Sequence, residues 1–506
     1  MSAARRLAVV VGALLLFRIA SAVFIVVQPG YTDAYYYGDV AKRLAAGQGL
    51  TADFIWNFLE APYGGAVPIA SHRFWMPLAT VLQSVGIASL PFVDPFRAAQ
   101  AAEIVVATFI PVVAYRAARV LGTSVDVALV AAAFAGLGGV FAPGWVSLDA
   151  FAPAALLGTL FFLAYGRAAR GDVEAGAIAG LLVGLLFLAR AEGALFGLGL
   201  LALVRAPTTR GAGIAGSAVA LGIGLAWLAR DLSLDPRPDL FARSVLLVRY
   251  EDFFATASPT WSAFVAAVPN VLAAKLAALG TNAVTFVFAF GLLLVPGLLE
   301  AIRARRTDAA VRAFAGLLGL VFLFQSLVVT LHSTHGSYLH SLAAFVPFGV
   351  ALGVTGSGTL LARIGRVRLM GTAGAAGVAA AIILSVFALV QWDDAFNAPY
   401  RARVAEAALI PPGRFMVVDA AAWRWIVRRP VLVTPADPGP CAFDQAAFSA
   451  VKWLVLEPVH FSAYDALYRG DGVERFPFLS PTQVNGDVRI YAIDLKRASE
   501  LCAAER

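Results

Sequence analysis

The chain has 506 residues, of which 60% are hydrophobic and 14% are charged, and its mean hydropathy is +0.78. Because about a quarter of the residues in a soluble domain are charged, this composition excludes a soluble protein and indicates one that crosses a membrane many times. The net charge of +7 comes from arginines that cluster between hydrophobic segments. Arginines in that position determine membrane topology, so we expect no nucleic-acid partner.

Hydrophobic segments recur along most of the chain. About 20 apolar residues are enough to cross a bilayer, and on this basis we predict eleven membrane helices. In chain order they cover residues 7–27, 98–120, 125–142, 149–165, 174–189, 193–204, 213–228, 282–299, 309–331, 338–355 and 370–390. The fifth and sixth could instead form one broken helix.

The arginines indicate which ends of these helices face the cytoplasm. With a cytoplasmic N-terminus, every short loop on that side is basic, as the positive-inside rule requires. These residues are Arg5, Arg6, Arg116, Arg119, Arg167, Arg170, Arg205, Arg210 and those within 303–306 and 363–368. An odd number of crossings then places everything after Val390 outside, which predicts a multi-pass protein of the plasma (inner) membrane. The first segment could be a cleaved signal peptide, but Arg18 interrupts it and favours an uncleaved helix.

Three segments break the hydrophobic pattern. We predict a polytopic α-helical membrane domain over 1–392 with large external loops at 28–97 and 231–281, followed by a small external α/β domain over 393–506. The first loop contains a polar stretch at 30–37, a short helix from Asp39 to Ala46, and an apolar piece, 78–90. That piece is too short to cross and is predicted to lie in the membrane interface. Prolines divide the second loop into short elements.

The tail alternates between strand-like and helix-like patterns, which predicts an α/β fold. Expected strands are 415–418, 431–434, 453–456 and 488–493, and expected helices are 420–428, 443–451 and 462–468. The two cysteines of the chain, Cys441 and Cys502, both lie in this tail. A disulfide between them is chemically permitted outside the cell, and two unpaired thiols are the alternative.

Two aspartates are candidate catalytic residues. Asp33 follows the first membrane segment in Thr32-Asp33-Ala34-Tyr35-Tyr36-Tyr37. A carboxylate there can deprotonate a hydroxyl, and the neighbouring tyrosines suit the faces of sugars; the alternative is a turn cap. Asp149 lies at the external mouth of the fourth segment. It could orient an acceptor, hold a divalent metal, or simply complement a helix dipole.

Other charged residues are candidates for binding a phosphate or a substrate. His72 and Arg73 could bind a phosphate or anchor the membrane interface. Arg190 and Glu192 could form an internal ion pair, or Arg190 could bind phosphate. A third group consists of Arg249, Tyr250 and Glu251, with Asp252 beside them. It could be a set of salt bridges at the surface or one wall of a cavity.

Three of the five histidines surround one predicted external turn. They are His332, His335 and His340. Their spacing does not match the ligand spacing of a metal site on a single helix. A metal site built from His335, His340, Asp33 and Asp149 therefore stays one interpretation among several.

The ordered motifs of the first 200 residues resemble the GT-C superfamily of glycosyltransferases that use polyprenyl-phosphate sugars, especially protein O-mannosyltransferases and aminoarabinose transferases. The matching segments are Thr32-Asp33-Ala34-Tyr35-Tyr36-Tyr37, Ala45-Ala46-Gly47-Gln48-Gly49 and Phe74-Trp75-Met76-Pro77-Leu78. By this resemblance Asp33 takes the place of the catalytic carboxylate, Asp149 that of the second acid, and Arg73 or His72 that of a cation for donor phosphate. Ala34 replaces a second acid found in many relatives, which leaves a metal in doubt.

The resemblance implies a membrane enzyme that transfers a sugar from a polyprenyl-phosphate carrier to a hydroxyl of a lipid, glycan or protein acceptor, outside the plasma membrane. Asp33 would be the general base, and the anomeric configuration would invert. The sequence contains no nucleotide-binding loop, so we expect no nucleotide cofactor. A polytopic transporter or lipid flippase is the main alternative, although its loops should be short and its halves symmetric. A membrane scaffold whose tail binds a partner is a third.

Overall fold

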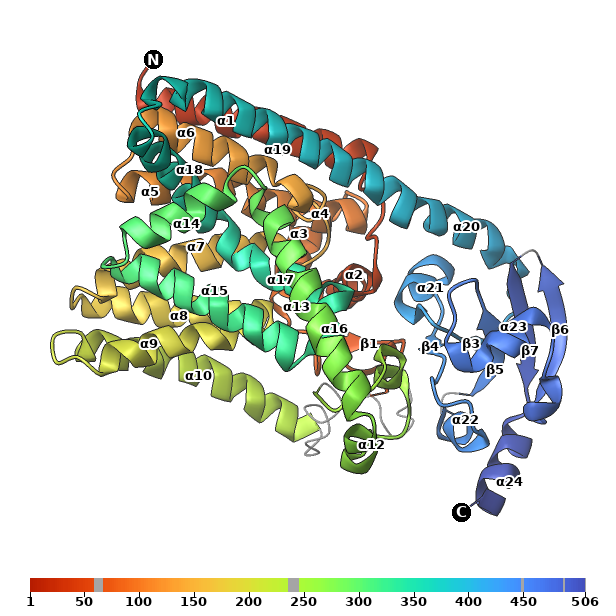
Figure 1. The fold of residues 1–506 in the computed structure, drawn as a ribbon. Helices are drawn as coiled ribbons and strands as arrows, with labels where there is room; N and C mark the ends of the chain where they lie inside the picture. The colour runs from red at the N-terminus through yellow and green to blue at the C-terminus, as the bar shows by residue number, and fades with distance from the viewer. Residues whose placement is uncertain (59–66, 235–244, 447–449, 486, 506) are drawn as a thin grey trace. The chain divides into compact units, whose positions relative to one another are not determined.

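The structure is a computed structural model of residues 1–506, and it describes all of them except 59–66, 235–244, 447–449, 486 and 506. Figure 1 shows the chain as a ribbon. Two compact units can be separated, which we call the helical unit and the mixed unit. The helical unit consists of Met1–Pro29, Trp75–Ser233 and Lys275–Ala395. The mixed unit consists of Gly30–Phe74, Leu234–Ala274 and Phe396–Arg506.

The helical unit is built from apolar helices joined by short turns. The main helices are α1 (Ala3–Phe24), α3 (Leu78–Ser89), α4 (Pro95–Thr108), α5 (Ile110–Val120), α6 (Val125–Leu137), α7 (Phe151–Ala168), α8 (Val173–Ala189), α9 (Gly197–Val204), α10 (Arg210–Leu234), α13 (Val268–Phe290), α14 (Val295–Ala304), α15 (Ala309–Leu327), α16 (Thr330–His332), α17 (Tyr338–Leu342), α18 (Val346–Arg363) and α19 (Met370–Trp392). Single turns lie between several of them, namely η1 (Gly139–Phe141), η2 (Ala191–Phe196), η4 (Ser333–Ser337), η5 (Ala343–Phe345) and η6 (Val367–Leu369). The helix α13 begins in the mixed unit. Figure 1 shows α1 and α19 running along α6.

Many of these helices are long and apolar enough to cross a membrane. Within the described residues there are eight such helical stretches, at Ala3–Phe24, Pro95–Val120, Phe151–Ala168, Arg210–Leu234, Val268–Phe290, Ala309–Leu327, Thr330–Arg363 and Val367–Leu409. Shorter apolar helices cover Leu78–Ser89, Val125–Leu137, Val173–Ala189 and Ala191–Val204. Each of the eleven predicted segments overlaps one of these stretches. The chain is therefore a multi-pass membrane protein, as its composition predicts.

One predicted segment is displaced along the sequence. The eighth was expected at 282–299, but the helix α13 starts at Val268 and ends at Phe290. The break follows from Gly291, whose positive φ of 78° interrupts the helix before α14 begins. The early start is tolerated because Pro269 lies in the first turn of α13, where a proline costs no hydrogen bond. The second external loop therefore ends earlier than the sequence pattern suggests.

Small residues let α8 and α10 approach closely. A Cβ added at Gly176 would fall on the carbonyl of Ala212, and one added at Gly180 would fall on the carbonyl of Gly216. Membrane helices gain little from apolar burial relative to lipid, so close van der Waals contact of this kind is what holds them together. The four-residue spacing of the two glycines places both on one face of α8.

Gly180→Val should weaken this contact and lower the free energy of unfolding by about 1–3 kcal/mol, the usual cost of overpacking. Thermal unfolding of the purified protein in detergent measures the change. The matched control is Gly222→Val, because a Cβ at Gly222 in α10 meets no atom within 4 Å. Equal midpoints for the two variants would contradict this account of the contact.

The mixed unit combines three separate stretches of the sequence. Its helices are α2 (Thr32–Ala45), α12 (Trp261–Ala266), α20 (Ala398–Glu406), α21 (Ala420–Val427), α22 (Pro440–Ala446), α23 (Asp465–Arg469) and α24 (Leu495–Glu505). Its turns are η3 (Tyr250–Phe254), η7 (Asp393–Asn397, which starts in the helical unit), η8 (Ala407–Leu409), η10 (Ser462–Tyr464) and η11 (Val473–Arg475). Its strands are β1 (Thr51–Ala52), β2 (Ile69–Ala70), β3 (Arg414–Val417), β4 (Val431–Val433), β5 (Val451–Leu456), β6 (Leu479–Asn485) and β7 (Val488–Ile493).

Five of these strands form one sheet in the order β4-β3-β5-β7-β6. β3 is parallel to β4 and β5, whereas β7 is antiparallel to β5 and β6. The α/β prediction for the tail is confirmed, but β6 was missed because Pro481 and its polar neighbours do not read as a strand. As an edge strand, β6 can accept that proline. Ile55 from the first loop lies parallel to β4 and pairs with Leu432.

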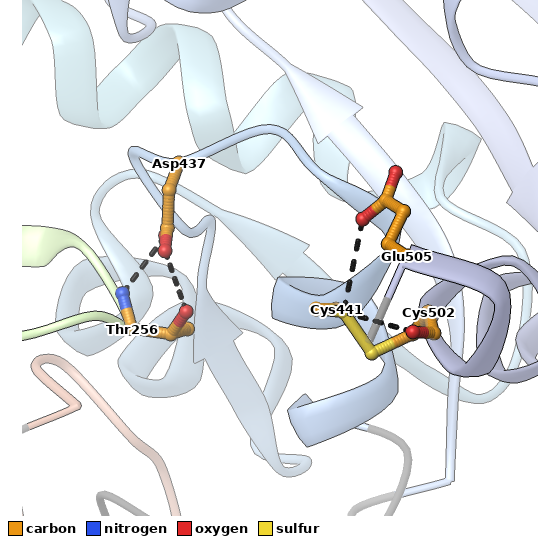
Figure 2. The surroundings of a disulfide bond; sticks show 5 residues. All are labelled: Thr256, Asp437, Cys441, Cys502 and Glu505. Carbon is orange, nitrogen blue, oxygen red and sulfur yellow. Dashed lines mark hydrogen bonds between the residues drawn. A yellow bond between two sulfur atoms is a disulfide. The ribbon is translucent and has the colours of Figure 1, made fainter.

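A disulfide bond joins Cys441 in α22 to Cys502 in α24 (Figure 2). The bond spans 61 residues of sequence and the Cα atoms are 4.6 Å apart. The structure thus decides between the two states that the sequence leaves open. Disulfides persist in oxidising compartments, so the bond agrees with an external position of the tail.

Removing the bond with Cys441→Ser should lower the stability of the mixed unit by about 2–4 kcal/mol. The readout is the thermal unfolding midpoint with and without a reducing agent. Reductant should lower the midpoint of the wild-type protein and leave that of the variant unchanged. Two thiols that react with a maleimide in unreduced, denatured wild-type protein would contradict the bond.

Candidate functional site

Asp33 lies in the first turn of α2, which begins at Thr32 and ends at Ala45. The prediction of a polar loop here with a helix from Asp39 is wrong, since the helix starts seven residues earlier. Its first turns hold together because the side chains of residues 34–37 are buried. An ionised carboxylate in the first turn of a helix is favoured by the helix dipole. The fold therefore provides Asp33 with a local field that supports its negative charge.

Tyr250 is a neighbour of Asp33 within the mixed unit. Burial of the phenol, and secondarily the charge of Asp33, raise the pKa of Tyr250 above its ordinary value of 10.0. The phenol therefore keeps its proton at neutral pH and can donate a hydrogen bond. Tyr250 begins the short turn η3, where its ring contacts that of Phe254 at a centroid distance of 5.8 Å.

The tyrosines that follow Asp33 hold the predicted phosphate-binding segment. Tyr36 accepts a 2.6 Å hydrogen bond from the backbone N–H of His72. The ring of Tyr37 stacks on His72 at 6.0 Å. His72 is fully buried and has a φ of 61°, an uncommon conformation for a residue with a Cβ and one that clusters at functional sites. Arg73 follows directly and is half-buried.

The other two candidates of this unit make local contacts. Arg249 donates to Asp252, with Nη2 2.9 Å from Oδ1. The carboxylate of Glu251 accepts from the backbone N–H of Ser462 at 3.1 Å and from its hydroxyl at 2.6 Å. Glu251 thus attaches η3 to η10, while the phenol of Tyr250, between these two residues, interacts electrostatically with Asp33. The mixed unit therefore gathers Asp33 and Tyr250 around one helix turn and His72 along the same helix.

In the helical unit, Asp149 pairs with His340. The Nε2 atom of His340 lies 3.2 Å from Oδ2 of Asp149, whose side chain is only 1% exposed. The imidazole ring packs edge-on against Phe151 at 4.2 Å between centroids. Asp149 lies two residues before the start of α7 and His340 lies in α17, and the fold brings their side chains together. One carboxylate oxygen and one imidazole nitrogen within 4.8 Å of each other are suitable ligands for a divalent metal.

A second buried acid lies near this pair and was missed. Glu103 in α4 is fully buried, and Oε1 accepts a 3.0 Å hydrogen bond from Nε2 of Gln83 in α3. It is near enough to Asp149 for their charges to interact. Glu103 could have been recognised as a candidate from the sequence, because it is an acid inside a predicted membrane segment. A charge there is costly and usually has a functional role.

Arg190 and Glu192 form the internal ion pair that was one of their two interpretations. Nε of Arg190 lies 2.6 Å from Oε1 of Glu192, and the side chains are 13% and 12% exposed. Glu192 also accepts a 2.6 Å hydrogen bond from Ser341, and Arg190 donates to Ser337 at 3.3 Å. These contacts connect η2 to the turn that carries the histidines.

His335 lies on the same turn but does not join the pair of Asp149 and His340. Its Nδ1 is 2.7 Å from the carbonyl oxygen of Leu331 in a solvent-exposed setting. Of the two histidines predicted as metal ligands, His340 is therefore the one that the structure pairs with an acid of the helical unit. Periodicity could not have shown this, because the kink at Gly336, with a φ of 107°, changes the direction in which the following residues point.

Comparison with known proteins identifies the fold. No protein-family model and no curated protein matches the sequence. The ArnT protein of Cupriavidus metallidurans, solved with undecaprenyl phosphate, is similar over 96% of this chain and 97% of its own, with 15% identity and a TM-score of 0.56. The oligosaccharyltransferase of Archaeoglobus fulgidus, solved with a tethered acceptor peptide, is similar over 89% and 68%, with 15% identity and a TM-score of 0.56.

A third similar structure is the arabinofuranosyltransferase AftD from mycobacteria. It covers 97% of this chain but only 41% of its own length, with 15% identity and a TM-score of 0.50. The three proteins share the GT-C fold of membrane glycosyltransferases, and this chain has that fold. The fold class implied by the motif resemblance is thereby confirmed.

Proposed function

We propose that this chain is a membrane glycosyltransferase that moves a sugar from a polyprenyl-phosphate carrier to an acceptor hydroxyl. The observation that carries the proposal is a carboxylate, Asp33, in the first turn of a helix and beside a protonated tyrosine, in a chain with the GT-C fold. ArnT, which has this fold, was solved with undecaprenyl phosphate, which is a carrier of the proposed chemical class. Lipids, glycans and proteins are the acceptor classes that carry a suitable hydroxyl.

Asp33 acts as the general base in this proposal. It takes the proton of the acceptor hydroxyl while the oxygen attacks the anomeric carbon from the face opposite the lipid phosphate, so the configuration inverts. The carbon–oxygen bond to the carrier breaks, and the lipid phosphate leaves with the bonding electrons. That phosphate is a weak base and needs positive charge rather than a proton donor. Arg73, with His72 beside it, is the proposed cationic contact.

Asp149 is the second proposed catalytic residue. Together with His340 it supplies one oxygen and one nitrogen donor, which are suitable ligands for a divalent metal. A bound metal would neutralise negative charge on phosphate oxygens. The buried position of the Asp149 and His340 pair fits such a role, since a buried carboxylate needs a cationic partner.

The proposed orientation places the N-terminus in the cytoplasm and the mixed unit outside the plasma membrane. Two observations support it. The predicted cytoplasmic turns are rich in arginine, for example Arg303 in the last turn of α14 and Arg305 and Arg306 directly after it. The mixed unit contains a disulfide bond, which persists in an oxidising compartment. A donor that arrives through the membrane then meets an acceptor from the external side.

The proposal is tested by incubating the purified protein in bilayer nanodiscs with polyprenyl-phosphate sugars and a mixture of lipid and glycan acceptors. Release of the lipid phosphate, followed by mass spectrometry, is the expected result. NMR of the product should show the anomeric configuration opposite to that of the donor. A protein that moves labelled lipid across liposome membranes without releasing lipid phosphate would be a flippase, and the proposal would fail.

A further inference from the structure

One face of α2 is attached along its length to α21 and the residue before it. At the start of α2, the hydroxyl of Thr32 donates to Oδ1 of Asp419, the N-cap of α21, at 3.2 Å. One turn later, Tyr35 packs edge-on against Trp425 at 6.0 Å between ring centroids. Further on, the ammonium of Lys42 lies 3.0 Å from the centre of the ring of Trp425.

Between the two ends of this contact, Arg424 of α21 forms ion pairs with two aspartates. Its Nη1 lies 3.9 Å from Oδ1 of Asp39, and its guanidinium binds Asp53 through Nε and Nη2. The residues of α2 that make these contacts are 32, 35, 39 and 42. Spacings of three and four residues place them on a single face of a helix. We call this set of contacts the α2–α21 seam.

The first contact of the seam is itself held by a buried ionic network. Asp419 accepts from Nη1 of Arg403 at 2.7 Å, and Nε of Arg403 also binds Oε1 of Glu457 at 2.8 Å. The side chain of Arg403 is 16% exposed and that of Glu457 is 6% exposed. Removing one member of such a network leaves an unpaired buried charge, so its geometry is strongly held. Asp419 therefore presents a fixed oxygen to Thr32.

Thr32 gives the N-terminus of α2 a side-chain contact with the tail. The N-cap residue of α2 is Tyr31, whose side chain makes no capping hydrogen bond. The first N–H groups of any helix have no partner within the helix, so contacts made by the residues of that end help to keep it ordered. The hydroxyl of Thr32 connects this end to the tail through Asp419. Asp33 is the next residue, about 100° further around the helix and outside the seam.

We propose that Asp419, held by Arg403, positions Asp33 for proton abstraction by fixing Thr32 at the start of α2. The inference rests on the proposed function and adds positioning residues to it. It gives the tail a part in catalysis, because Asp419 and Arg403, which hold Thr32, both lie after residue 400. Proton transfer needs the base within hydrogen-bond reach of the acceptor hydroxyl, and a displacement of about 1 Å can cost 10²-fold in rate.

Two variants test the seam, each with a conservative partner or control. Thr32→Val keeps the shape of the side chain and removes the hydroxyl, whereas Thr32→Ser keeps the hydroxyl. Asp419→Asn removes the charge that binds Arg403. Thr482→Val and Asp471→Asn are the controls, because both residues are exposed and lie away from the seam in sequence.

Two measurements are made on every variant. Hydrogen exchange followed by mass spectrometry reports the protection of peptide 30–40 without any need for activity. Steady-state kinetics reports kcat, KM for the donor, and the pH dependence of kcat. We expect Thr32→Val and Asp419→Asn to speed exchange in that peptide and to lower kcat by roughly 10- to 100-fold with KM unchanged. Thr32→Ser, which keeps the hydroxyl, should have the exchange rate and the kcat of the wild type. The two control variants should also resemble the wild type.

The outcomes separate the seam from the enzymatic proposal. Faster exchange with a lower kcat and a shifted acidic limb of the pH profile supports the positioning role. If the wild-type enzyme is active, the positioning role is overturned by either of two results. One is an unchanged exchange rate in the variants, and the other is faster exchange with a wild-type kcat and pH profile. A wild-type protein without transfer to any acceptor overturns the proposed function itself, and the role of the seam with it.

Discussion

Asp33→Asn should lower kcat for sugar transfer by about 10²- to 10⁴-fold, the usual contribution of a general base. The amide is nearly the same size as the carboxylate but cannot accept the proton of the acceptor hydroxyl. Because Asp33 is replaced by another polar residue in a first helical turn, the fold should persist. The KM for the lipid donor should change little, since the proposal assigns the donor phosphate to Arg73 and not to Asp33. The assay is lipid-phosphate release from a polyprenyl-phosphate sugar.

A matched control for this variant is Asp126→Asn. Asp126 also lies in the first turn of a helix, α6, but its side chain is 73% exposed and pairs with Arg6 at the surface. Surface pairs of this kind contribute about 0–1 kcal/mol, so the control should keep wild-type turnover. Wild-type turnover in purified, correctly folded Asp33→Asn would show that Asp33 is not the general base.

Asp149→Asn is expected to have the second-largest effect. If Asp149 and His340 hold a divalent metal, the amide should release it, because a neutral oxygen is a much weaker ligand than a carboxylate. Activity should fall by at least about 10- to 100-fold, which is the cost of losing even an outer partner of a metal site. Chelation of the wild-type protein should have the same effect, and adding Mn²⁺ or Mg²⁺ should reverse it.

The metal content of the purified proteins provides a readout that does not depend on activity. Inductively coupled plasma mass spectrometry should find the metal in the wild type and less of it in both Asp149→Asn and His340→Gln. Asp308→Asn is the control, because Asp308 is an exposed N-cap and asparagine caps a helix equally well. Equal metal content in all four proteins would contradict a metal held by the buried pair.

Local sequence patterns were sufficient for most individual elements. The strand β7 was predicted at its observed bounds, Val488–Ile493, and the helix α3 within one residue of its observed end, Ser89. Both have a strong local signal, since apolar residues recur with the period of the element. The helix α2 was predicted too short, because its first turns contain tyrosines and a glycine, which are weak helix formers. Those turns are stabilised by packing on α21, which lies almost 400 residues later in the sequence.

The candidate site was predicted in part. Asp33 and Asp149 were chosen as candidates because an acid beside a membrane segment is costly and rare. The pairing of Asp149 with His340, and the burial of Glu103 beside them, depend on how helices far apart in sequence pack together. Likewise, no local pattern distinguishes Glu251, which attaches two turns to each other, from Tyr250, whose pKa responds to Asp33.

By itself, the sequence determined that this protein crosses a membrane many times and that its tail is an α/β structure, since hydrophobicity and its period act locally. Only the tertiary structure decided that the segment with Asp33 is a helix and that the tail clamps its first turn. It also decided that the two cysteines are bonded. The reason is physical: burial, ion pairing and disulfide formation require groups that are distant in sequence to meet, and that information exists only in the packed chain.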